Sequence, residues 1–131
     1  MKLEEHQKRL KESLDVIEDC IQKGALERQR NIGFNVSAAA VDMLEMLLHT
    51  KNLISPGVII KHDWFSSTNK INEKIQPDFP NKKEILNLMH DIETKRNILC
   101  YGKTQKLEII QETLQKFNIL KNIFKELNIH E

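Results

Sequence analysis

Residues 104–128, TQKLEIIQETLQKFNILKNIFKELN, carry the clearest structural pattern in the chain. Apolar side chains recur there at steps of three and four, which places them on one face of an α-helix. They are Leu107, Ile110, Leu114, Phe117, Leu120, Phe124 and Leu127. The pattern predicts a long amphipathic helix that packs this stripe against a core, with Leu114 and Phe117 buried.

The same periodicity predicts four further helices upstream. Their expected ranges are about 2–23, 25–52, 67–75 and 81–101, and the chain breaks between them at Gly24, at residues 54–57 (ISPG), at residues 76–80 (QPDFP) and at Gly102. The apolar stripes of the first two helices include Leu3, Leu10, Leu14, Ile17 and Ile21, and then Leu26, Ile32 or Gly33, Val36, Ala40, Met43, Leu44 and Leu47. Asn81 and Glu84 have the spacing of a capping box at the start of the fourth helix. Residues 58–67 (VIIKHDWFSS) are expected to form loop and short turns, because no second run offers this one a strand partner.

Composition agrees with one helical domain over residues 1–131. The chain is 40% hydrophobic but only 5% aromatic, with four Gly and three Pro, which suits aliphatic helices packed side by side. The fold class is therefore predicted as all-α, an up-and-down bundle of four to five helices. The small side chains of residues 37–40 (SAAA) allow another helix to approach closely, which favours the centre of a bundle and a homodimer.

Charge and cysteine content set the expected surroundings. The formal net charge is +1, so the overall charge favours neither nucleic acid nor a membrane surface. Cys20 and Cys100 have no metal spacing and are expected to be free thiols. No apolar run is long enough for a membrane helix, and the N-terminus is too polar for a signal peptide. We expect a cytoplasmic protein without membrane contact, and the abundance of Lys, Ile and Asn suggests a prokaryotic source.

The densest positive stretch is KRNILCYGKTQK, residues 95–106. It holds Lys95, Arg96, Lys103 and Lys106 and no acidic residue. One interpretation is a solvated helix end, where cations face the negative end of the helix dipole. The other is an anion site with Arg96 as its most specific ligand, because a guanidinium presents a planar fork to a phosphate.

This stretch resembles the motif of the HEPN (higher eukaryotes and prokaryotes nucleotide-binding) domains. Arg96-Asn97, three residues and then Tyr101-Gly102 end the penultimate long helix, where that family has an Arg, a polar residue and, four to six residues after the Arg, a His. Upstream, a long helix leads through a Gly-containing turn to Lys61-His62, which is also similar to the family. The resemblance covers about residues 25–127.

The resemblance implies a helical bundle that dimerises, with the Arg and His of both subunits in one cleft. Active members cut RNA without a metal or another cofactor: the 2′-hydroxyl attacks the adjacent phosphate, the His assists proton transfer and the Arg holds the phosphate. Here Tyr101 occupies the place of the His, and a phenol keeps its proton at neutral pH and is a poor general base. The resemblance therefore predicts Arg96 and Asn97 as binding residues, and Tyr101 as a hydrogen-bond donor or a surface for base stacking.

Other polar residues have both a functional and a plain interpretation. His62 beside Asp63 is either a tuned acid–base group or a solvated loop residue, and Trp64 and Phe65 are either a stacking platform or a plug on the bundle. Asp42, Glu45 and His49 share one helix face, which fits a metal site or an exposed polar stripe, and we expect no metal. No function is assigned to His6, His90 and His130.

Three functions remain open. The first is a homodimeric module that binds RNA or a nucleotide through Arg96, Asn97, Tyr101, Lys95 and Lys103. Some HEPN members form toxin–antitoxin pairs with a nucleotidyltransferase, so the resemblance also implies a possible partner of that kind. The second is a metal-independent ribonuclease in which Tyr101 or His62 replaces the missing His. The third is a purely structural oligomerising bundle.

Overall fold

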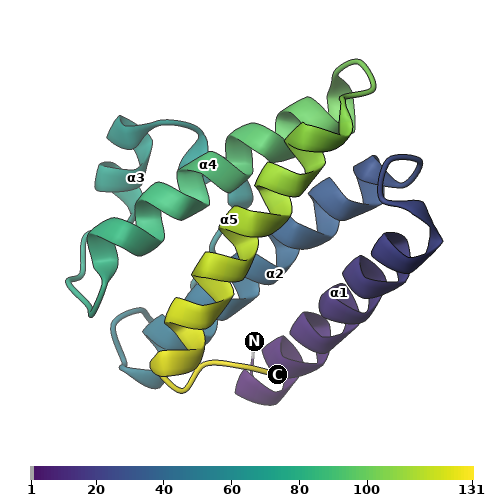
Figure 1. Cartoon of the computed structure of the whole chain (residues 1–131). Coiled ribbons are helices and arrows are strands. Elements are labelled where there is room, and N and C mark those ends of the chain that lie inside the picture. Colours follow the sequence, from purple (N-terminus) through teal and green to yellow (C-terminus); the bar gives the residue numbers. More distant parts are fainter. Residues whose placement is uncertain (1) are drawn as a thin grey trace.

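The computed structural model describes residues 2–131 and is all-helical, with no strand among those residues. Its elements are α1 (Leu3–Gly24), α2 (Gln29–Thr50), the 3₁₀ helix η1 (His62–Ser66), α3 (Thr68–Lys74), α4 (Lys82–Tyr101) and α5 (Leu107–Glu126). The four long helices run alternately up and down, and the short α3 lies beside α4 at one edge of the bundle (Figure 1). The all-α bundle predicted from the periodicity is confirmed.

Helix α2 is the centre of the bundle, since α1, α4 and α5 all pack against it. Its side chains from Asp42 to Leu48 are all buried, whereas α1 and α5 each bury only one face. Gly33 marks the closest approach to α4, because a Cβ added there would lie 3.0 Å from Cys100 Sγ and 3.1 Å from Leu99 Cβ. The small residues thus serve contacts within one chain.

That result removes one argument for a dimer. Ser37, Ala39 and Ala40 are buried inside the bundle, and only Ala38 of this run is exposed. The homodimer remains a prediction that the small-residue run does not support.

The helix boundaries follow local chemistry. Gly24 ends α1 with a φ of 127°, a conformation that favours glycine, and residues 25–28 form a turn before α2. Ser67 caps α3 by accepting a hydrogen bond from the Lys70 amide at 3.1 Å. The predicted capping box at Asn81 is wrong: Asn81 precedes α4 in a left-handed conformation, with a φ of 61°, and its side chain makes no capping hydrogen bond.

The buried face of α5 agrees with the pattern at its centre and departs from it at its start. Ile110, Phe117, Leu120 and Phe124 are buried, and Leu114 is only partly buried. Four residues expected on inward stripes are 40–49% exposed instead: Leu3, Ile21, Leu26 and Leu107. Each lies at or near a helix end, where the neighbouring helix no longer covers the stripe.

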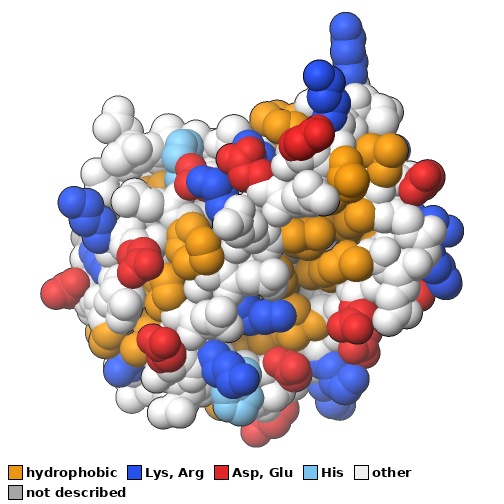
Figure 2. All heavy atoms as spheres, viewed as in Figure 1, with side chains coloured by type: hydrophobic (Ala, Val, Ile, Leu, Met, Phe, Trp, Pro, Cys, Tyr) orange, Lys and Arg blue, Asp and Glu red, His pale blue; other side chains and the backbone are white. Residues whose placement is uncertain are grey.

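Figure 2 shows apolar side chains gathered in the furrow between α5 and α1, on the face drawn in Figure 1. Leu10, Leu14 and Met43 line a cavity of about 480 Å³ there, together with the C-terminal His130 and Glu131. None of the described helices is long and apolar enough to span a membrane.

Candidate functional site

A cleft of about 590 Å³ opens beside the middle of α2. The residues that line it come from α1, α2, α4 and the segment around η1, and Arg96 is the one that α4 contributes. Its charged lining consists of Arg9, Lys61 and Arg96 as cations and Asp42 and Asp63 as carboxylates. His62, between Lys61 and Asp63 in the sequence, also lines it. Four elements far apart in the chain therefore combine to form one pocket with both charged and apolar side chains in its lining.

Both carboxylates of the cleft already have cationic or hydrogen-bonding partners. Asp63 lies 3.6 Å from Lys70 Nζ, and Asp42 Oδ1 lies 2.9 Å from His6 Nδ1. Burial raises the pKa of the Asp42 carboxyl, while its hydrogen bond with His6 lowers it. The charge of Arg9 also lowers this pKa, so Asp42 and Arg9 interact and the carboxylates offset part of the positive charge of the cleft.

Arg96 lies against a pair of aromatic rings. Its guanidinium carbon lies 4.9 Å from the centroid of Phe34 and 5.8 Å from that of Tyr101. The two rings meet edge to face, with centroids 6.1 Å apart. Stacking on aromatic faces leaves the N–H edge of a guanidinium available for a planar anion.

The other predicted ligands do not line the cleft with Arg96. Lys95 lies 3.3 Å from Glu112 on α5, and its side chain is 16% exposed, so its charge is satisfied on another side of α4. Asn97 and Lys103 are exposed outside the lining, and Tyr101 is 68% exposed next to Arg96. The positive run of residues 95–106 is therefore not one continuous binding surface.

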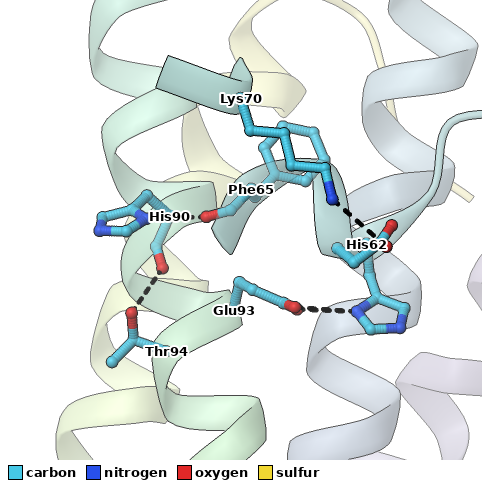
Figure 3. A network of polar contacts seen from close by, with 7 residues as sticks. His62, Phe65, Lys70, His90, Glu93 and Thr94 are labelled. Atoms are coloured by element: carbon cyan, nitrogen blue, oxygen red, sulfur yellow. Dashed lines mark hydrogen bonds and ion pairs between the residues drawn. The ribbon is translucent and has the colours of Figure 1, made fainter. Parts of the chain in front are cut away.

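His62 has a partner that its sequence neighbours did not reveal. Its Nδ1 lies 2.9 Å from Oε1 and 3.0 Å from Oε2 of Glu93, a carboxylate on α4 that is buried. Figure 3 shows Glu93 reaching from α4 toward His62 across the gap between the helices. Because a carboxylate can only accept, His62 Nδ1–H donates to Glu93. The His62 side chain is 41% exposed, and the rest of its ring lines the cleft.

The neighbourhood of this pair is fixed by further contacts. His90 Nδ1 donates to the Phe65 carbonyl at 2.7 Å, and Phe65 is buried (Figure 3). Trp64 is partly buried against the core, with the Lys74 ammonium 5.7 Å from its ring centroid. Phe65 thus acts as a plug in the core rather than as a stacking platform, and it anchors η1 to α4.

Sequence reasoning found Arg96 and considered His62, but missed Phe34 and Glu93. Glu93 precedes Arg96 by three residues and so shares its side of α4, which was the one available signal. Phe34 lies within the second predicted helix but was not part of its predicted apolar stripe. Its place beside Arg96 depends on how α2 packs against α4.

The face of Asp42, Glu45 and His49 is not the exposed stripe that the sequence allowed. Asp42 and Glu45 are only 4% and 3% exposed, and His49 is partly buried. His6 of α1, to which no function was assigned, is 1% exposed and lies against this face. That exposed-stripe interpretation is wrong because α1 covers the face.

No family model, curated protein or solved structure matches this chain.

Proposed function

We propose that the cleft around Arg96 binds a phosphate group of single-stranded RNA or of a nucleotide. The observation that carries this proposal is the position of the Arg96 guanidinium, which lies over the Phe34 ring at the wall of a cleft of about 590 Å³. Arg9 and Lys61 line the same cleft. Arginine forks bind phosphate oxygens through two parallel N–H bonds, and the exposed ring of Tyr101 offers a flat surface beside that position for a base.

A stacked Arg96 suits recognition better than a freely moving one. The long side chain of a free arginine loses rotamer freedom when it binds, which lowers affinity. Contact with Phe34 and Tyr101 already restricts Arg96 before a ligand arrives. The remaining cations of the cleft add attraction that depends on salt concentration.

A second candidate, metal-independent RNA cleavage, is favoured by one specific observation, the pairing of His62 with Glu93. A carboxylate on Nδ1 fixes the tautomer and leaves Nε2 as a proton acceptor. In that reaction Nε2 takes the proton of the 2′-hydroxyl, O2′ bonds to phosphorus, and the bond from phosphorus to O5′ breaks. The leaving O5′ takes a proton from water, and the product is a 2′,3′-cyclic phosphate.

The proposal includes the resemblance to HEPN domains, with a homodimer and a partner protein. A HEPN-like homodimer would bring two Arg96 side chains together, and a nucleotidyltransferase would be its partner in a toxin–antitoxin pair. The helical bundle and the composite cleft support this likeness. A cytoplasmic location would agree with an RNA ligand.

Binding is tested by titrating fluorescent single-stranded RNA with the full chain at two salt concentrations. We expect affinity to fall with salt, and Arg96→Ala to weaken binding and reduce the salt slope by about 1. Arg96→Lys keeps the charge but loses the fork, and it should restore binding only in part. Lys51→Ala removes an exposed cation at the far end of α2 and serves as the control.

If the wild type binds neither RNA nor a nucleotide at low salt, the proposal fails and the structural interpretation takes its place. Cleavage is tested on the same RNA with chelator present. Loss of the 2′,3′-cyclic product in His62→Gln, with RNA binding retained, would support catalysis. Binding without any cleavage in the wild type would leave the first candidate and exclude the second. Tyr101→His, which restores the family motif, is expected to create or increase cleavage.

A further inference from the structure

Four polar side chains are gathered between the start of α1 and the C-terminal half of α2. His6 comes from α1, and Asp42, Glu45 and His49 follow one face of α2. His6, Asp42 and Glu45 are at most 4% exposed. Buried polar groups are costly unless each finds a partner, so this cluster requires an explanation.

Hydrogen bonds account for only part of the cluster. His6 Nδ1 lies 2.9 Å from Asp42 Oδ1, and Glu45 Oε1 accepts the backbone N–H of Ile60. His6 Nε2 lies 2.8 Å from Glu45 Oε2 but not in hydrogen-bonding alignment. Within residues 2–131, the Nε2 atoms of His6 and His49 are both buried without a hydrogen-bond partner.

The unsatisfied atoms converge. One ligand atom from each of His6, Glu45 and His49 lies within 4.8 Å of the other two. Imidazole nitrogens and carboxylate oxygens bind Zn²⁺ at about 2.0–2.2 Å, so two ligands of one tetrahedral ion are about 3.3–3.6 Å apart. Side-chain rotations that move these atoms by less than about 1 Å would bring all three onto one ion.

We propose that His6, Glu45 and His49 form a binding site for a divalent transition-metal ion of the Zn²⁺ type. Two histidines and a glutamate are a known ligand set for zinc, and they leave a fourth position of the tetrahedron for water. His49 is the only one of the three ligands that is partly exposed, so its side of the site lies nearest to solvent. The site joins α1 to α2 and does not depend on RNA binding or cleavage in the cleft.

Asp42 and Ile60 hold the ligands in place. A histidine that binds a metal through Nε2 usually donates Nδ1–H to a carboxylate, which orients the ring and raises its basicity. Asp42 stands in that position for His6. The Ile60 amide likewise fixes one oxygen of Glu45 and leaves the other beside His6.

A proton is the simplest competitor for the metal. A protonated His6 would lie within ion-pairing distance of both Asp42 and Glu45, because an imidazolium carries an N–H on each nitrogen. It would leave His49 Nε2 buried and unpaired, with its ring stacked on His6 at a centroid distance of 6.0 Å. A second positive or proton-donating ring beside His6 is unfavourable, whereas a metal uses both rings as electron-pair donors.

The test uses the full chain, freed of metal with a chelator and titrated with Zn²⁺ by calorimetry and with Co²⁺ by visible absorbance. We expect one ion per chain and Co²⁺ bands typical of tetrahedral nitrogen and oxygen ligands. His49→Gln and Glu45→Gln should weaken binding by more than about 100-fold, and Asp42→Asn by about 10- to 100-fold. His130→Ala, at an exposed C-terminal position, is the matched control and should bind like the wild type.

Circular dichroism establishes that each variant is folded. If His49→Gln does not fold, nitrogen NMR of the wild type decides: Zn²⁺ must move the ring signals of two histidines, and His62→Gln, His90→Gln and His130→Gln must each retain this response. Failure of the wild type to bind Zn²⁺ or Co²⁺, or binding that His49→Gln leaves intact, would overturn the proposal. The metal site and the RNA-binding cleft can fail independently. If the chelated wild type binds RNA but takes up no Zn²⁺ or Co²⁺, the metal proposal fails and the proposed function stands.

Discussion

Replacement of Phe117 and of Leu114 by alanine tests how α5 is oriented on the bundle. Phe117 is 2% exposed, and removing a fully buried phenylalanine ring costs about 3–5 kcal/mol of unfolding free energy. Leu114 is three residues earlier but only partly buried, so less of its surface returns to water and solvent fills part of the space. We therefore expect Leu114→Ala to cost about 1–2 kcal/mol, less than a buried leucine does.

Urea unfolding followed by far-UV circular dichroism measures both variants. With a slope of about 2 kcal/mol per molar, Phe117→Ala should lower the midpoint by about 2 M and Leu114→Ala by less than about 1 M. Ile119→Ala, at a 43% exposed position of the same helix, is the control and should stay within about 0.5 kcal/mol of the wild type. A larger loss for Leu114→Ala than for Phe117→Ala would show that α5 faces another way.

Three further predictions concern packing, thiol chemistry and assembly. Gly33→Ala should destabilise the chain by about 1 kcal/mol in urea unfolding, because the new methyl group meets Cys100 Sγ and Leu99 Cβ and overpacking exceeds the gain in helix propensity. Burial raises the pKa of the Cys100 thiol, so native protein should react slowly with a thiol reagent and unfolded protein quickly. Because the unfolded chain loses this proton at a lower pH than the folded chain, the contribution of Cys100 to the unfolding free energy should be full below about pH 8.5 and fall as the pH rises above it. Sedimentation equilibrium should give about twice the chain mass of 15.4 kDa if the homodimer forms, and a monomer at micromolar concentration would refute that part of the proposal.

The fold could be predicted because it depends on local patterns. Apolar steps of three and four define α5 and α2, and Gly24 ends α1 where a left-handed residue is needed. The same patterns overstated burial at helix ends, as Ile21 and Leu107 show. A stripe tells which side of a helix faces inward, but the length of its neighbour decides how far along that side the cover extends.

The site could be predicted only where its chemistry is local. Arg96 was recognisable from the residues around it, because cations and a polar neighbour at the end of a helix are a pattern in sequence. The partner of His62 lies 31 residues away on α4, so the adjacent Asp63 was the only carboxylate that sequence could offer. Asp63 instead lies against Lys70, and the group that orients His62 is a buried glutamate.

The polar face of α2 shows why composition alone misjudges such residues. Asp42, Glu45 and His49 at steps of three and four indicate a solvated helix face, since charged side chains are seldom buried without partners. The side chain that reverses this expectation is His6 of α1, which lies 36 residues before Asp42, and Arg9 of the same helix adds its charge near Asp42. Burial raises the pKa of the Asp42 carboxyl, and a positive charge at His6, whether a proton or a metal ion, would stabilise the ionised carboxylates. His49 distinguishes the two: its buried Nε2 gains nothing from a proton on His6 and gains a bond from a metal.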